Sequence, residues 1–222
     1  MSPEELATTF VALFVTIDPI GLAPVFVSLT RGMTPTQRNA VGLRAVLVGG
    51  GLLAVFGLAG EPLIATVGIS LPAFRISGGL LLFLIAVDML FEKRSARREK
   101  HVAEASSATH PTADGGFEPA DPSVFPLAMP LIAGPGALAT MILLGGENQG
   151  DILGLAAVLG VMLVVVGLTF LVFRAGNLTE RILGHNGVVV VTRLFGMLLA
   201  ALAVQFVLDG LGDIGVLPVA PE

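Results

Sequence analysis

The sequence predicts an all-α membrane protein in which six transmembrane helices form two inverted-topology repeats of three, with helices one and four broken near the midplane. Three observations predict this fold. The 222 residues are 54% hydrophobic and 13% charged, with a mean hydropathy of +0.89, and so little charge cannot cover a water-soluble domain of this size. Six apolar segments are each long enough to cross a bilayer. Motifs of the first half recur in the second.

The apolar segments set the expected helices. They lie at about 6–29, 41–60, 72–91, 124–146, 152–173 and 188–210. A shorter apolar stretch, Pro62 to Ser70, cannot span a bilayer, so we expect a re-entrant or interfacial segment there. The N-terminus lacks the basic region of a signal peptide, so the first segment is expected to remain as a span.

Basic residues indicate the orientation of the helices. Lys and Arg flank the first, third and fifth connections and are absent from the N-terminus, the fourth connection and the C-terminus. The positive-inside rule therefore predicts a multi-pass protein of the inner (plasma) membrane with both termini on the outer side. The third connection, 92–122, opens with a basic block and continues in small polar residues, which predicts a flexible cytoplasmic linker between a 1–91 repeat and a 123–222 repeat.

The two halves share matched residues at a nearly constant spacing. Arg75 and Arg193 are 118 residues apart. Pro19 and Pro135 are 116 residues apart, and so are Gly68 and Gly184. Matched Arg, Gly and Pro residues are informative in a chain so rich in Leu and Ala. Because each half has three spans, the second half must insert upside down, which is typical of secondary transporters.

Helices one and four are each expected to break near their centres. Helix one contains Asp18-Pro19-Ile20-Gly21, and helix four contains Gly134-Pro135-Gly136. Proline removes a backbone donor and clashes with the preceding turn, and glycine loosens the helix. Paired breaks at corresponding positions predict a binding site near the midplane. The alternative is that both are kinks that only shape the packing.

Asp18 is the only ionisable residue near the centre of a span. An acid there costs about 2.5–3.5 kcal/mol on insertion scales, so we expect it to serve as an ammonium partner, a cation ligand or a proton carrier. Asp before Pro is also a favourable N-cap, so the simpler interpretation is that Asp18 caps the half-helix starting at Pro19. The two roles are compatible.

Gly134 occupies the corresponding cap position but has no side chain. The donors of a half-helix starting at Pro135 would then be open to a carboxylate. With Asp18 opposite, the two breaks would form a site for a zwitterion. The residues expected to bind the substrate are Asp18, Pro19, Gly21, Gly134, Pro135, Gly136 and Ala137.

Three further polar residues are candidates for gating or ion pairing. Arg75 and Arg193 lie at equivalent positions, near the outer and inner edges of their helices. They either gate the two sides and pair with an acid such as Asp18, or extend to the interface. Gln205 is a candidate lining residue of helix six.

Several classes of function are not expected. The chain has no cysteine, which excludes disulfides and thiolate metal sites. It contains no phosphate loop, dinucleotide fingerprint, metalloprotease motif or nucleophile elbow. We therefore expect no enzyme, no cofactor and no bound metal, and the absence of a basic, aromatic-rich surface argues against nucleic acid as a partner.

These motifs together resemble the MarC family of bacterial and archaeal membrane proteins. The resemblance rests on Asp18–Phe26, Arg75–Ala86, Pro126–Gly136 and Arg193–Ala203, in that order along nearly the whole chain. Some members are neutral amino acid transporters for glycine, alanine and similar solutes. The resemblance thus implies that 18–24 and 134–136 line the site.

The function expected from these observations is secondary transport of small neutral amino acids. The expected partners are a small zwitterionic solute, a proton or sodium ion, and the lipid bilayer. The alternatives are a passive channel or facilitator for small solutes, and a membrane scaffold or regulatory protein.

Overall fold

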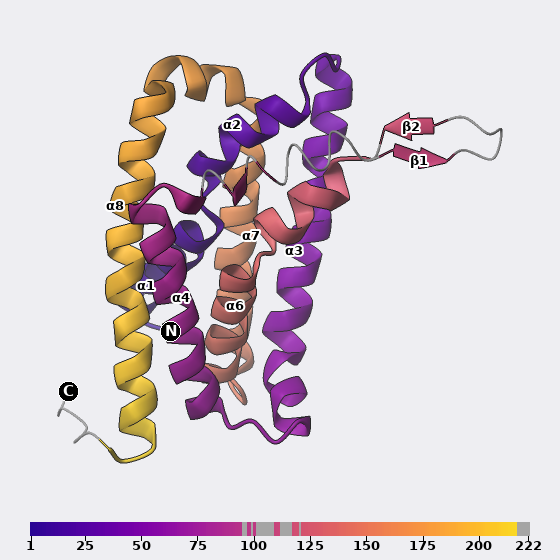
Figure 1. Ribbon diagram of the computed structural model, residues 1–222. Helices are drawn as coiled ribbons and strands as arrows, with labels where there is room; N and C mark the ends of the chain where they lie inside the picture. Colours follow the sequence, from indigo (N-terminus) through magenta and orange to yellow (C-terminus); the bar gives the residue numbers. More distant parts are fainter. Residues whose placement is uncertain (95–96, 99, 101–108, 112–116, 120, 217–222) are drawn as a thin grey trace.

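The computed structural model, drawn in Figure 1, describes residues 1–94, 97–98, 100, 109–111, 117–119 and 121–216. Among these residues five helices are long and apolar enough to cross a membrane, and one bent pair raises the number to as many as six. The prediction of a multi-pass helical membrane protein is therefore confirmed.

The first span is broken at the Asp-Pro sequence. α1 (Pro3–Ile17) and α2 (Pro19–Leu29) meet at Asp18, whose backbone is left-handed with φ 56°. α1 begins in a capping box, in which the side chains of Ser2 and Glu5 each accept the other residue's backbone N–H. Pro19 has no N–H to continue the hydrogen bonds of α1, so the first helix ends there.

α3 (Pro35–Thr66) is longer than predicted. It continues through Pro62 to Thr66, so the expectation of a separate re-entrant or interfacial segment beginning at Pro62 is wrong. Proline at this position removes one hydrogen bond four residues from the end of the helix, and that loss does not end it. A turn with Gly68 at φ 82° then leads into α4 (Leu71–Leu90).

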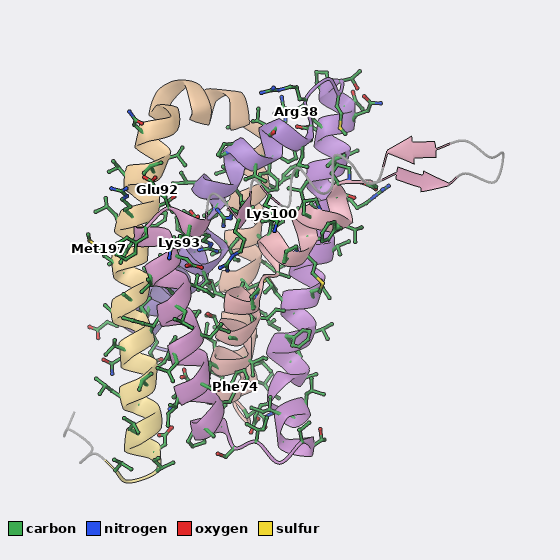
Figure 2. All side chains as sticks on the ribbon, in the orientation of Figure 1. Arg38, Phe74, Glu92, Lys93, Lys100 and Met197 are labelled. Atoms are coloured by element: carbon green, nitrogen blue, oxygen red, sulfur yellow. The ribbon has the colours of Figure 1, made fainter. Side chains whose placement is uncertain are left out.

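Beyond α4 the chain turns back over the bundle in what we call the basic segment, residues 93–100. Its described helical residues are Lys93, Arg94, Arg97, Arg98 and Lys100. Figure 2 labels its first and last residues, beside the end of α4 and toward the centre of the bundle. Further along, β1 (Thr109–Pro111) and β2 (Phe117–Pro119) pair antiparallel and extend away from the helices (Figure 1). Much of the predicted linker, 92–122, lies outside the described residues.

The fourth predicted helix is also broken. The irregular helical segment η1 (Ser123–Ile132) and α6 (Pro135–Glu147) meet at 58° on either side of Gly134. Within η1 the residues before Pro126 and Pro130 are extended, because a following proline disfavours helical backbone.

α7 (Ile152–Arg174) and α8 (Gly176–Asp213) complete the bundle. α8 begins before its predicted start at 188 and turns at Gly184, where φ is 60°. Its membrane-spanning part is Asn186–Asp213.

α4 and α8 lie side by side and antiparallel (Figure 1). Glycines allow this approach: a β-carbon on Gly79 would lie 2.7 Å from the Ala203 carbonyl oxygen, and one on Gly196 would lie 3.1 Å from that of Ala86. Close contact through small residues is how transmembrane helices gain packing energy in lipid. The outward faces of the helices carry exposed leucines, as a lipid-facing surface requires.

Candidate functional site

A cavity of about 210 Å³ lies where the two broken spans meet. Its wall is built from the end of α1, α4, the basic segment, η1 and the start of α6. Its polar lining side chains are Thr16, Asp88, Arg94, Arg97 and Arg98. We call it the basic cavity, because three guanidinium groups face one carboxylate on its wall.

Four of the predicted site residues, Gly134 to Ala137, line this cavity at the start of α6. Gly134 holds the N-cap position in extended conformation, and no side chain caps the helix. A β-carbon on Gly134 would lie 2.5 Å from the Pro130 carbonyl oxygen, so only glycine fits. The first backbone N–H groups of α6 are therefore left without a side-chain acceptor at the positive end of the helix dipole.

Asp18 is fully buried and performs the predicted capping role. Its side chain accepts a hydrogen bond of 3.1 Å from the backbone N–H of Gly21. The other carboxylate oxygen forms an ion pair of 2.9 Å with Nη1 of Arg98. Asp18, Pro19 and Gly21 thus lie behind Arg98 and are not among the described residues that line the basic cavity. A β-carbon on Gly21 would lie 2.6 Å from Arg98 Nη1, so glycine makes room for this pair.

Arg98 is buried in the bundle although it belongs to the connection between the two halves. Its side chain is only 6% exposed. Nη1 donates to Asp18, but Nη2 is buried and has no hydrogen-bond partner among the described residues. A buried guanidinium N–H without an acceptor costs stability, so this nitrogen is suited to donate a hydrogen bond to an anion.

Arg94 and Arg97 fix the basic segment against the broken span and α4. Arg94 Nη2 donates a 2.6 Å hydrogen bond to the carbonyl oxygen of Thr16, at the end of α1. That carbonyl is left over where the helix breaks, so Arg94 acts as a C-terminal cap. Arg97 pairs with Asp88 at 2.9 Å. Burial, and next the charge of Arg98, lower the pKa of Arg94 to about 9, and the carboxylates of Asp18 and Asp88 offset only part of this shift.

A second cavity, of about 450 Å³, lies at the other end of α1 and α6. Its lining includes the carboxylates of Glu4, Glu5, Glu147 and Asp209, so we call it the acidic cavity. The predicted lining residue Gln205 belongs to its wall and donates a 2.7 Å hydrogen bond to Asp209.

An apolar cluster separates the two cavities. We call it the apolar partition; its buried members are Val15, Leu82, Ala86, Met89, Leu143, Leu199, Ala203 and Phe206. Along α1, Ala12 lines the acidic cavity, Val15 belongs to the partition and Thr16 lines the basic cavity. Along α6 the order is reversed, from Ala137 through Leu143 to Leu144. The two helices therefore run antiparallel past the same apolar partition.

The two arginines that sequence analysis matched, Arg75 and Arg193, are both paired, but not with Asp18. Arg75 is 12% exposed and contacts Glu147 at 2.9 Å and Asp213 at 2.6 Å. Arg193 is 50% exposed and contacts Glu92 at 2.7 Å. Arg75 thus joins α4 to the ends of α6 and α8, and Arg193 joins α8 to Glu92, just after the end of α4.

The residues that form the broken spans, the cavities and the arginine ion pairs are distributed over almost the entire chain. The similarity of the chain to known proteins covers nearly the same residues. A family model described as MarC family integral membrane protein matches residues 4–214. The chain belongs to the MarC family.

Relatives of this MarC family chain occur in bacteria and archaea. The UPF0056 membrane protein YvbG of Bacillus subtilis is 36% identical over 210 residues, which cover 95% of this chain and 94% of YvbG. The UPF0056 inner membrane protein YhgN of Escherichia coli K12 is 34% identical over 210 residues, covering 94% and 96%. A UPF0056 membrane protein of Methanocaldococcus jannaschii is 32% identical over 212 residues, covering 95% and 98%. No solved structure matches the chain significantly.

The candidate site of this MarC protein includes polar residues that sequence analysis did not select, above all Arg94 and Arg98. The feature of the sequence that could have indicated them is the high density of positive charge after the third span. Five cations occur in the eight residues 93–100, directly after a span, which is more than orientation in the membrane requires. The sequence did not indicate that this block would fold back against Asp18.

Proposed function

We propose that the protein is a secondary transporter of small neutral amino acids, such as glycine and alanine, in the inner membrane. The observation that carries the proposal is the pair of cavities on opposite sides of one apolar partition. The half-helices α1 and α6, one from each broken span, contribute residues to both cavities. Alternating access requires a site between two such openings. The amino acid would bind at the start of α6, and an acid in the acidic cavity would admit a coupling proton or sodium ion.

The proposal includes an inverted repeat. Each half consists of a broken span, a long helix and a final helix that packs against its counterpart. The matched glycines Gly68 and Gly184 both have positive φ, and the matched Arg75 and Arg193 both form ion pairs. With basic connections on the cytoplasmic side, the basic cavity would open inward and the acidic cavity outward.

Uptake into proteoliposomes tests this function. Purified protein should accumulate labelled alanine or glycine against its gradient, and a protonophore or sodium ionophore should abolish the accumulation. Equilibration without accumulation would instead indicate a passive facilitator. Absence of any flux with folded protein would indicate a scaffold or regulatory role.

A further inference from the structure

The carboxylates near the basic cavity already form ion pairs with arginines. Asp18 is paired with Arg98, and Asp88 with Arg97, both at 2.9 Å. An incoming ammonium group would have to displace a guanidinium group from either acid. Among the described residues of the cavity wall and their partners, no carboxylate is left for a positively charged solute group.

The positive groups, in contrast, are not fully balanced. Arg94, Arg97 and Arg98 face the two acids, which leaves one positive charge in excess. The uncapped donors at the start of α6 add the positive end of a helix dipole to the same wall. One monovalent anion would neutralise this site, whereas a dianion would overcompensate it.

A particular nitrogen is available for that anion. Nη2 of Arg98 is buried and has no hydrogen-bond partner among the described residues, and the Arg98 side chain belongs to the wall that also holds Gly136 and Ala137. A guanidinium N–H and two backbone N–H groups are a suitable set of donors for the two oxygens of a carboxylate. The remaining wall includes Ile85 and Leu131, which suit a short alkyl group.

We infer that the basic cavity binds a short monocarboxylate through Arg98 Nη2 and the start of α6, and that it recognises the carboxylate without recognising an ammonium group. This inference rests on the proposed function and specifies its substrate class. Desamino acids such as propionate should therefore bind as well as alanine. Arg98 would bind Asp18 through one nitrogen and the ligand through the other, so the negative charge of Asp18 repels the ligand carboxylate across the same guanidinium.

Equilibrium binding to the purified full chain in detergent tests the ligand class. By titration calorimetry, propionate and L-alanine should bind with affinities within about tenfold of each other. Alaninamide, which keeps the ammonium group but lacks the carboxylate, should not bind, and chloride should not compete at equal concentration. Binding of alanine without propionate, binding of alaninamide, or equal competition by chloride would each overturn the inference.

Two substitutions test the role of Arg98. Arg98→Lys keeps a cation for Asp18 but removes the second nitrogen, so propionate should bind about ten- to a hundredfold more weakly. Arg44→Lys, in an exposed ion pair with Asp121 outside the cavity, is the matched control and should bind as wild type does. Asp18→Asn keeps an acceptor for Gly21 and tolerates left-handed backbone, but removes the negative charge.

Asp18→Asn distinguishes this inference from an ammonium site at Asp18. Carboxylate binding should become tighter in this variant, whereas an ammonium partner at Asp18 would make alanine bind more weakly. Weaker propionate binding in Asp18→Asn, or unchanged binding in folded Arg98→Lys, would overturn the inference. Carboxylate binding without alanine uptake by proteoliposomes would refute only the transport proposal, and uptake without propionate binding would refute only the carboxylate site.

Discussion

Arg98 Nη1 lies 2.9 Å from Asp18 Oδ2, so two residues eighty positions apart form a buried ion pair at the break of the first span. The pair joins the connection between the halves to the point where α1 ends and α2 begins. Asp18 also caps α2, so a single carboxylate holds both the half-helix and the basic segment in place.

Removing one member of this pair should destabilise the protein strongly. Asp18→Leu leaves the Arg98 guanidinium buried without a counter-charge and should cost about 3–5 kcal/mol. Asp18→Asn retains a hydrogen-bond acceptor and should cost less, roughly 1–3 kcal/mol. Thermal unfolding in detergent measures both variants. The double variant Asp18→Leu with Arg98→Met should recover much of the loss, and additive losses would show that the two side chains are not coupled.

A methyl group at the break of the fourth span should be harmful, whereas one on the outer face of α3 should not. Gly134→Ala places a β-carbon 2.5 Å from the Pro130 carbonyl oxygen, so backbone must move and stability should fall by about 1–3 kcal/mol. Gly51 lies within α3, and a β-carbon there would approach no neighbouring group of the described residues within 4 Å. Gly51→Ala should therefore be neutral or stabilise the helix by up to about 1 kcal/mol. Equal losses in the two variants, measured by thermal unfolding in detergent, would contradict the close contact at Gly134.

Arg75 and Arg193 should differ in their contribution to stability. Arg75→Gln removes a largely buried cation from between Glu147 and Asp213 and should cost about 3 kcal/mol or more. Arg193→Gln removes one member of a half-exposed pair and should cost less than about 1 kcal/mol. Denaturation in mild detergent compares them directly. A loss in Arg193→Gln as large as that in Arg75→Gln would refute this ranking.

Local sequence signals predicted the spans and their breaks, but not the contacts of Arg98. Hydropathy located the transmembrane helices because each must satisfy its own backbone in lipid. Asp18-Pro19 and Gly134-Pro135 marked the breaks because proline acts on its own turn. Pro62 carries the same signal, yet α3 continues through it, since the cost of one lost hydrogen bond depends on the packing around it. The ion pair between Arg98 and Asp18 depends on how the chain folds back, which no local pattern encodes.

Because the chain contains no cysteine, the water accessibility of the two cavities can be tested with single introduced cysteines. Leu202 lines the acidic cavity and Ile85 the basic cavity, while Leu47 is 65% exposed on the outward face of α3. Single substitutions Leu202→Cys, Ile85→Cys and Leu47→Cys would each introduce the only thiol of the chain. Only a hydrated thiol ionises and reacts readily, so a membrane-impermeant reagent reports water at each position.

With the basic cavity on the cytoplasmic side, intact cells should show labelling of the Leu202→Cys variant and not of the Ile85→Cys variant. Inside-out vesicles should give the opposite result, because the apolar partition of Val15, Leu143 and their neighbours separates the two sides. The Leu47→Cys variant should react in neither case, since lipid excludes the reagent from that face. Labelling of Ile85→Cys from outside in the absence of substrate would mean either that the orientation is reversed or that the partition does not seal. The Leu202→Cys result separates these two cases, because a reversed protein would not be labelled there from outside.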